Sequence, residues 1–94
     1  MVVGVCTIYL ELPGNGSLKG KRRVLKSLMA GLRREFNVSV AEVGENDLWQ
    51  SAALGVATVS NDPAYAHGLL SRVVEWIEKQ RLDVTLSDYE IEML

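Results

Sequence analysis

The chain has 94 residues, of which 48% are hydrophobic and 23% charged, a balance that is typical of a folded globular domain and excludes an intrinsically disordered chain. This length predicts a single domain spanning residues 1–94, and the net charge of −2 excludes neither an anionic nor a cationic partner. No stretch approaches the roughly 20 apolar residues that span a bilayer, and the single cysteine, Cys6, excludes an internal disulfide and a cysteine-based zinc site.

The first half of the chain predicts a strand, a helix and a hairpin. Val2–Leu12 alternates with a period of two, and both of its faces are largely apolar, which indicates a central strand. Leu18–Phe36 carries apolar residues at helical spacing after Ser17, which is a plausible N-cap. Two shorter alternating segments, Val38–Val43 and Trp49–Ser60, predict strands joined by a turn.

The second half predicts one more helix and one more strand. Asn61-Asp62-Pro63 is a typical helix start, and the helix ends near Gln80. Val84–Leu94 predicts the last strand, and its alternation slips near Ser87-Asp88, which indicates a bulge. The order βαββαβ with right-handed crossovers predicts an α+β, ferredoxin-like fold with an antiparallel sheet in the order 4-1-3-2 and both helices on one face.

Two further expectations concern the surface and the cellular location. If the even positions of the first strand face the helices, then Val3, Val5 and Tyr9 point outward from the open face, which is unusually apolar for contact with water. The segment Met1–Cys6 has no basic start of the kind found in signal peptides. We therefore expect a cytoplasmic protein with no membrane contact.

The start of the first helix is the feature that indicates a function. The segment 17–34 contains no acid and seven bases, and six of them are candidate anion- or nucleic-acid-binding residues: Lys19, Lys21, Arg22, Arg23, Lys26 and Arg33. Cations are unfavourable at a helix N-terminus, where the macrodipole is positive, unless an anion binds there. Lys19, Arg23, Lys26 and Arg33 fall near one line that can follow a phosphate backbone. The alternatives are a solvated face, or pairing with the acidic last strand of a neighbouring subunit.

Two aromatic residues are candidates for stacking with nucleic-acid bases. The predicted topology brings the end of the first strand, the start of the first helix and the Gly44–Leu48 turn to one end of the sheet. Tyr9, Trp49 and the basic cluster are therefore expected near each other, an arrangement that suits single-stranded nucleic acid. The alternative is that Trp49 belongs to the core or to an interface. No Walker-type loop, catalytic motif, metal site or cofactor site is predicted.

Several blocks resemble the YlxP-like family of small bacterial proteins, whose function is unknown. The blocks are Leu18-Lys19-Gly20-Lys21-Arg22-Arg23, Phe36–Val43, Asp47-Leu48-Trp49-Gln50 and Leu54-Gly55. The resemblance covers essentially the whole chain and implies a ferredoxin-like fold and a bacterial cytoplasmic location. The family's genes are often found near translation factors, which implies an association with RNA or the ribosome. No catalytic residues carry over from the family.

Three functions follow from these observations. The first is a non-enzymatic module that binds RNA or a ribosomal surface through the basic first helix. The second is a homodimeric scaffold or interaction protein that uses the open sheet face. The third, on fold analogy alone, is an acylphosphatase-like hydrolase of phosphate esters, although the Gln-Gly-Val-x-Phe-Arg type of loop is missing.

Overall fold

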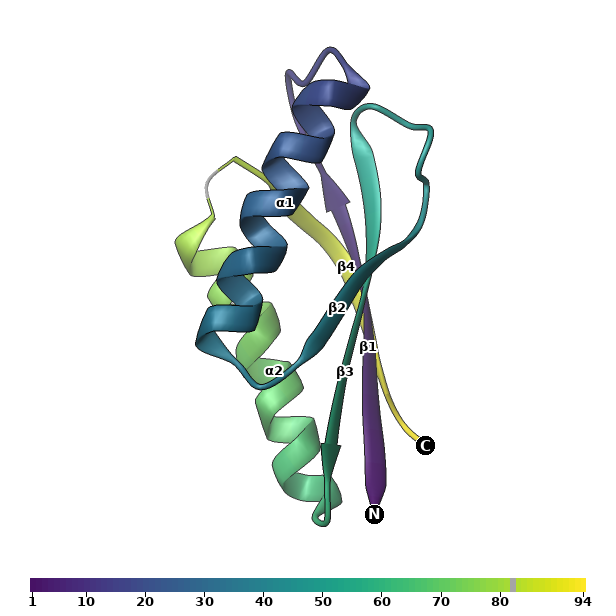
Figure 1. Cartoon of the computed structure of the whole chain (residues 1–94), viewed down its shortest axis with the longest axis vertical. Helices are drawn as coiled ribbons and strands as arrows, with labels where there is room; N and C mark the ends of the chain where they lie inside the picture. Colours follow the sequence, from purple (N-terminus) through teal and green to yellow (C-terminus); the bar gives the residue numbers. More distant parts are fainter. Residues whose placement is uncertain (82) are drawn as a thin grey trace.

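The computed structural model describes residues 1–81 and 83–94. Its elements, in chain order, are β1 (Val2–Glu11), α1 (Leu18–Glu35), β2 (Ser39–Gly44), β3 (Ser51–Ser60), α2 (Pro63–Gln80) and β4 (Thr85–Met93). The strands form one antiparallel sheet in the order β2-β3-β1-β4, and both helices cover the same face of it (Figure 1). The predicted ferredoxin-like fold and the predicted strand order are confirmed.

The core lies between the helices and the covered face of the sheet. The even-numbered residues of β1 point into it, and Cys6, Ile8 and Leu10 are at most 1% exposed. They pack with buried residues of both helices, among them Leu25, Leu28 and Leu32 of α1 and Leu70, Val73 and Ile77 of α2. Each fully buried leucine or isoleucine side chain stabilises the fold by about 1.5–3 kcal/mol. This shared core fixes α1 and α2 on the sheet.

The predicted bulge lies in β4, where it reverses the direction of the side chains. Tyr9 of β1 faces Asp88, and Leu10 faces Leu86, so Ser87 is the extra residue. The Ser87 hydroxyl donates to the Tyr9 carbonyl at 3.1 Å. Because of the bulge, Leu86 packs against the core, whereas Asp88 lies on the open face with Tyr9.

The second helix begins as its sequence predicts, and the two helices meet at Trp76. At the start of α2 the Asp62 carboxylate accepts from the Ala64 N–H at 3.0 Å, and Pro63 is the first helical residue. Between the helices, the Trp76 ring approaches Gly31 so closely that a Cβ there would lie 2.8 Å from it. Phe36 meets the same ring edge to face, with centroids 6.4 Å apart.

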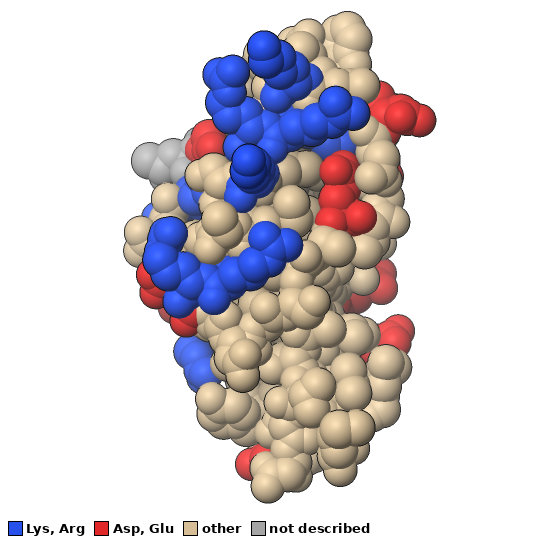
Figure 2. All heavy atoms as spheres, in the orientation of Figure 1, with Lys and Arg blue, Asp and Glu red and all other residues tan. Residues whose placement is uncertain are grey.

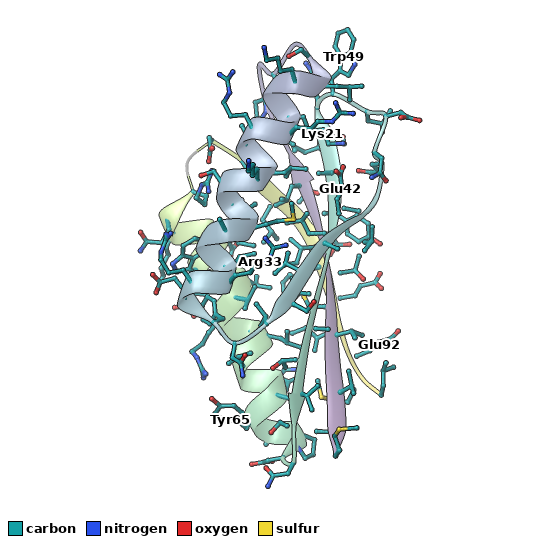
Figure 3. All side chains as sticks on the ribbon, viewed as in Figure 1. Lys21, Arg33, Glu42, Trp49, Tyr65 and Glu92 are labelled. Atoms are coloured by element: carbon teal, nitrogen blue, oxygen red, sulfur yellow. The ribbon has the colours of Figure 1, made fainter. Side chains whose placement is uncertain are left out.

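Charge is strongly divided between the two faces of the molecule. All lysine and arginine residues lie in α1 or α2, except Arg81, which directly follows α2. The register places four charged side chains on the open sheet face, and all of them are acids: Glu11, Asp88, Glu90 and Glu92. Glu92 points away from the helices in Figure 3. A polyanion is therefore attracted to the helix layer and repelled by the open face.

No helix in residues 1–81 and 83–94 is long and apolar enough to cross a membrane. In the same part of the chain, no three His, Cys, Asp or Glu side chains are grouped so that they could hold a metal ion.

Candidate nucleic-acid interface

The start of α1 satisfies its backbone groups without an acidic side chain. Ser17 is the N-cap, and its hydroxyl accepts from the Gly20 N–H at 3.0 Å. The first turn contains no acid. The first turn of the helix therefore supplies no carboxylate of its own to the positive end of the helix dipole, which favours an anion at this point.

Four exposed cations continue from this end along the outer surface of α1, and we call them the basic stripe: Lys19, Arg22, Arg23 and Lys26. Their spacing of three and four residues places them on one side of the helix. None of the four has an ion pair or a side-chain hydrogen bond within the part of the chain that the structure describes. Figure 2 shows Lys and Arg side chains gathered over α1. The stripe is therefore available to an external anion.

Lys21 does not belong to this surface, contrary to the sequence prediction. It is 1% exposed, and its ammonium donates to the Glu45 carbonyl at 2.6 Å and to the Leu48 carbonyl at 2.8 Å. Its third neighbour is the Glu42 carboxylate, at 3.0 Å. The ammonium group thus has two carbonyl acceptors and one ion-pair partner inside the fold, and Glu42 Oε2 is a buried oxygen whose only charged neighbour among the described residues is this lysine. Lys21 holds the β2–β3 loop against α1 and is not free to bind an anion.

Arg33 lies on the same side of α1, about 21 Å along the helix from Lys19 at 1.5 Å per residue. It is exposed, but its guanidinium donates to the Val40 carbonyl of β2 at 2.8 Å. Only part of its hydrogen-bonding capacity therefore remains for a ligand. Arg34, also exposed, is its neighbour on this surface.

Trp49 lies beside the start of α1 because Asn15 connects two loops. The Asn15 amide donates to the Trp49 carbonyl and, at 2.9 Å, to the Ser17 carbonyl. The Gln50 amide in turn donates to the Asn15 carbonyl at 3.1 Å. The Trp49 side chain is 53% exposed and borders an open hollow of about 490 Å³ formed by residues 47–51. In Figure 3 its ring projects from the end of the molecule where α1 begins.

Tyr9 lies elsewhere, so the predicted grouping of both aromatics with the cations is wrong for this residue. It is an odd-numbered residue of β1, half-buried on the open face opposite Ala53 and Asp88. The sheet separates it from the helix layer that carries the stripe. The only charged neighbour that the register gives Tyr9 is an acid, which does not favour a phosphate there.

Gly20→Ala is expected to loosen this junction rather than stabilise the helix. In a helix interior alanine is favoured over glycine by up to about 1 kcal/mol. At Gly20, however, a Cβ would overlap Asn15 Oδ1, so alanine must displace the amide that connects the two loops. We expect no gain in melting temperature and faster amide exchange at residues 48–50. The control is Gly68→Ala in α2, where a Cβ meets only Arg72 Nη1 at 3.7 Å. This variant should raise the melting temperature. Equal stabilisation by the two variants would contradict this account.

Four other side chains of chemically reactive types are Cys6, Glu45, Asp47 and His67. Burial raises the pKa of the Cys6 thiol from 9.0 to about 11, which makes it a poor nucleophile near neutral pH. His67 is exposed on α2, and Glu45 and Asp47 are exposed in the β2–β3 loop.

The inward position of Lys21 could have been predicted from the helical spacing. Lys21 falls at the same helical spacing as Leu25, Leu28 and Leu32, whereas Lys19, Arg22 and Arg23 do not. A lysine in line with a core stripe requires an internal acceptor, and Glu42 of β2 supplies the charge for it. The role of Asn15 had no comparable signal, because loop residues carry no periodicity.

The fold and this surface define a small α+β domain of ferredoxin-like topology with a basic helix face. Residues 3–91 match the family described as "Protein of unknown function (DUF503)", and the chain belongs to this family. It is 40% identical over 73 residues to the "Uncharacterized protein YlxP" of Bacillus subtilis (strain 168), covering 78% of this chain and 75% of the relative. The resemblance found in the sequence is confirmed.

One solved structure with low sequence identity shares the fold, and a second matches more weakly. The de novo designed protein Foldit4 matches with a TM-score of 0.54 and 17% identity, over 100% of this chain and 97% of that chain. A putative antibiotic biosynthesis monooxygenase from Deinococcus radiodurans matches with a TM-score of 0.45 and 18% identity, over 100% of this chain and 90% of that chain. At such identities a likeness indicates architecture alone.

Proposed function

We propose that the protein is a non-enzymatic module that binds RNA, as free RNA or on a ribosomal surface, through the basic stripe of α1. We also propose that it acts in the cytoplasm, where such partners occur. The observation that carries the proposal is that four exposed cations extend from the positive end of a helix dipole and have no acidic partner in the described fold.

A chain of phosphates suits this surface better than a single small anion. The stripe from Lys19 to Lys26 is about 10 Å long at the helical rise, and Arg33 and Arg34 continue the same side. An isolated phosphate could contact only one or two of these residues, whereas a nucleic-acid backbone can follow the row. Approach from the other side is disfavoured, because the open face carries only acidic charge.

Trp49 favours unpaired nucleotides over a duplex. Its exposed ring lies at the end of the molecule where α1 begins (Figure 3), and Lys19 and Arg22 belong to the first residues of that helix. Stacking on an aromatic ring needs a base that is free of its own stack, as in single strands, loops and bulges. The proposed ligand is therefore RNA with unpaired bases, held by phosphate contacts on α1 and by one base on Trp49.

The test is fluorescence anisotropy of a labelled 12-nucleotide RNA titrated with the protein. If the four residues of the stripe contact four phosphates, the slope of log K against log salt is about −3 for a single strand. Raising the salt from 50 to 200 mM should then weaken binding by about 50-fold. No binding at 20 mM salt, or binding that does not depend on salt, would overturn the proposal.

Trp49→Ala should weaken binding of the single strand by about 5- to 150-fold, because stacking contributes about 1–3 kcal/mol per base. A duplex of the same sequence should lose much less. The matched control is Tyr65→Ala, which removes an aromatic side chain that is also exposed, at the other end of the molecule (Figure 3). An equal loss in the two variants would contradict the stacking role of Trp49.

A further inference from the structure

We propose that the open sheet face binds a second copy of this chain, so that two molecules pack sheet against sheet. The contact surface is formed by nine uncharged outward side chains of β1, β2 and β3, beyond which Tyr9, Glu11, Ser51 and Ala53 continue the same face. We call these nine residues the open face centre: Val3, Val5, Thr7, Ser39, Ala41, Val43, Gly55, Ala57 and Val59. This inference is independent of the proposed RNA binding, which uses the opposite layer.

The open face centre is apolar and partly hollow. Val43, on the edge strand β2, is 58% exposed, and Val59, near the end of β3, is 62% exposed. Between them β3 offers only small residues, and a hollow of about 410 Å³ lies over Gly55 and Ala57, with Val5 and Val43 among its walls. A surface with raised valines beside a hollow of glycine and alanine can receive side chains from a facing copy.

The charge pattern selects a second copy and also its orientation. No outward residue of the open face centre is charged, so the surface requires no oppositely charged partner. The acids lie at its rim, mainly on β4. A two-fold axis parallel to the strands and above β3 superposes β1 on the β2 of the other copy and leaves both β4 strands outside the contact. The two acidic rows are then about 19 Å apart at 4.8 Å per strand, beyond the screening length of physiological salt.

Other arrangements of two copies are less favourable. Pairing β4 edge to edge, or stacking one β4 over the other, brings Asp88, Glu90 and Glu92 of both copies together. Like charges in direct opposition are destabilising. A nucleic acid is repelled by the same acids. The uncharged apolar centre and the acidic rim therefore favour a second copy of the chain, with the two-fold axis above β3.

The area indicates a weak dimer rather than an obligate one. Two strands of ten residues and one of six cover about 400 Å² of flat area at about 3.3 Å per residue and 4.8 Å per strand. The pair therefore covers about 800 Å² before the relief of the side chains is added, which is near the lower limit of specific interfaces. We expect a dissociation constant of roughly 10–100 µM. Such a dimer carries one basic stripe on each outer layer.

The test is sedimentation velocity of the wild-type chain from 5 to 500 µM. The sedimentation coefficient should rise from the monomer value to the dimer value over this range. Ala57→Glu, which places a charge at the middle of the open face centre, should raise the dissociation constant at least tenfold. The control is Ala64→Glu, at an exposed position of α2, which should dimerise as the wild type does.

A second measurement does not depend on the folding of a variant. Methyl NMR spectra of the wild-type chain at 20 µM and 1 mM should differ at Val5, Val43 and Val59, while Val73 and Val74 of α2 stay unchanged. A chain that remains monomeric at 500 µM would overturn the proposal and leave the face to a different protein. Equal dimerisation of Ala57→Glu and Ala64→Glu, or shifts confined to the helices, would also overturn it.

Discussion

Replacement of both Arg22 and Arg23 by glutamate should lower the affinity for single-stranded RNA by about 60-fold or more at 50 mM salt. This figure comes from the loss of two phosphate contacts. Each contact contributes about 0.7 to the slope of log K against log salt, and the lost affinity is calculated between 50 mM and 1 M salt. Repulsion by the new carboxylates adds to this loss. The slope of log K against log salt should fall from about −3 to about −1.5. Anisotropy titrations at four salt concentrations measure both effects.

The matched control for this variant changes the charge by the same amount elsewhere. Arg72 and Lys79 are exposed residues of α2, and their double replacement by glutamate gives the same net charge. If the overall charge of the chain decides the affinity, the two variants bind equally weakly, and the assignment of the site to α1 is wrong. If the basic stripe is the site, the α2 variant keeps most of the affinity. Because all four residues are exposed, both variants should fold.

Lys21→Met should destabilise the fold by about 3–5 kcal/mol, because it removes one partner of a buried ion pair. Methionine keeps the volume and the helix propensity but leaves the Glu42 carboxylate and the carbonyls of Glu45 and Leu48 without their donor. Because the Glu42 side chain is 21% exposed and can gain some water, the lower end of this range is expected. Thermal unfolding should show a fall in melting temperature of at least about 12 °C.

Two further variants separate the buried pair from a general effect of losing a lysine. Lys26→Met removes a cation from the exposed side of the same helix and should change the stability by no more than about 0.5 kcal/mol. Lys21→Met combined with Glu42→Leu should recover part of the loss, because it removes the carboxylate that was left unpaired. The contact contributes little if the melting temperature of Lys21→Met lies within 2–3 °C of the wild type and Lys21→Met is not the least stable of the three variants.

Much of the fold follows from local patterns in the sequence. The period of two in β1 and the helical stripes of α1 and α2 depend on which residues must leave water, and a single core satisfies all of them. Even the bulge was visible, because Leu86 and Asp88 have the same parity but opposite polarity, and a strand can place them on opposite faces only if one residue is inserted. The outward direction of Val3 and Val5, which are half-buried, then follows from the parity of β1.

The candidate site was predicted only in part, for a different reason. The basic stripe is a property of one helix and can be read from spacing. The position of Lys21 depends on β2, 21 residues further along the chain at Glu42, and the position of Trp49 depends on Asn15 in another loop. Contacts of this kind leave no period in the sequence, because each is made by a single side chain with a distant backbone group.

The sequence by itself therefore determined the order of elements, the topology of the sheet, the basic side of α1 and the apolar open face, because each depends on a repeating pattern of polarity. Only the tertiary structure decided which cation of α1 is buried and that Asn15 holds Trp49 beside the start of this helix. These outcomes depend on where a long flexible side chain finds acceptors in three dimensions, and spacing along one helix or strand does not contain that information.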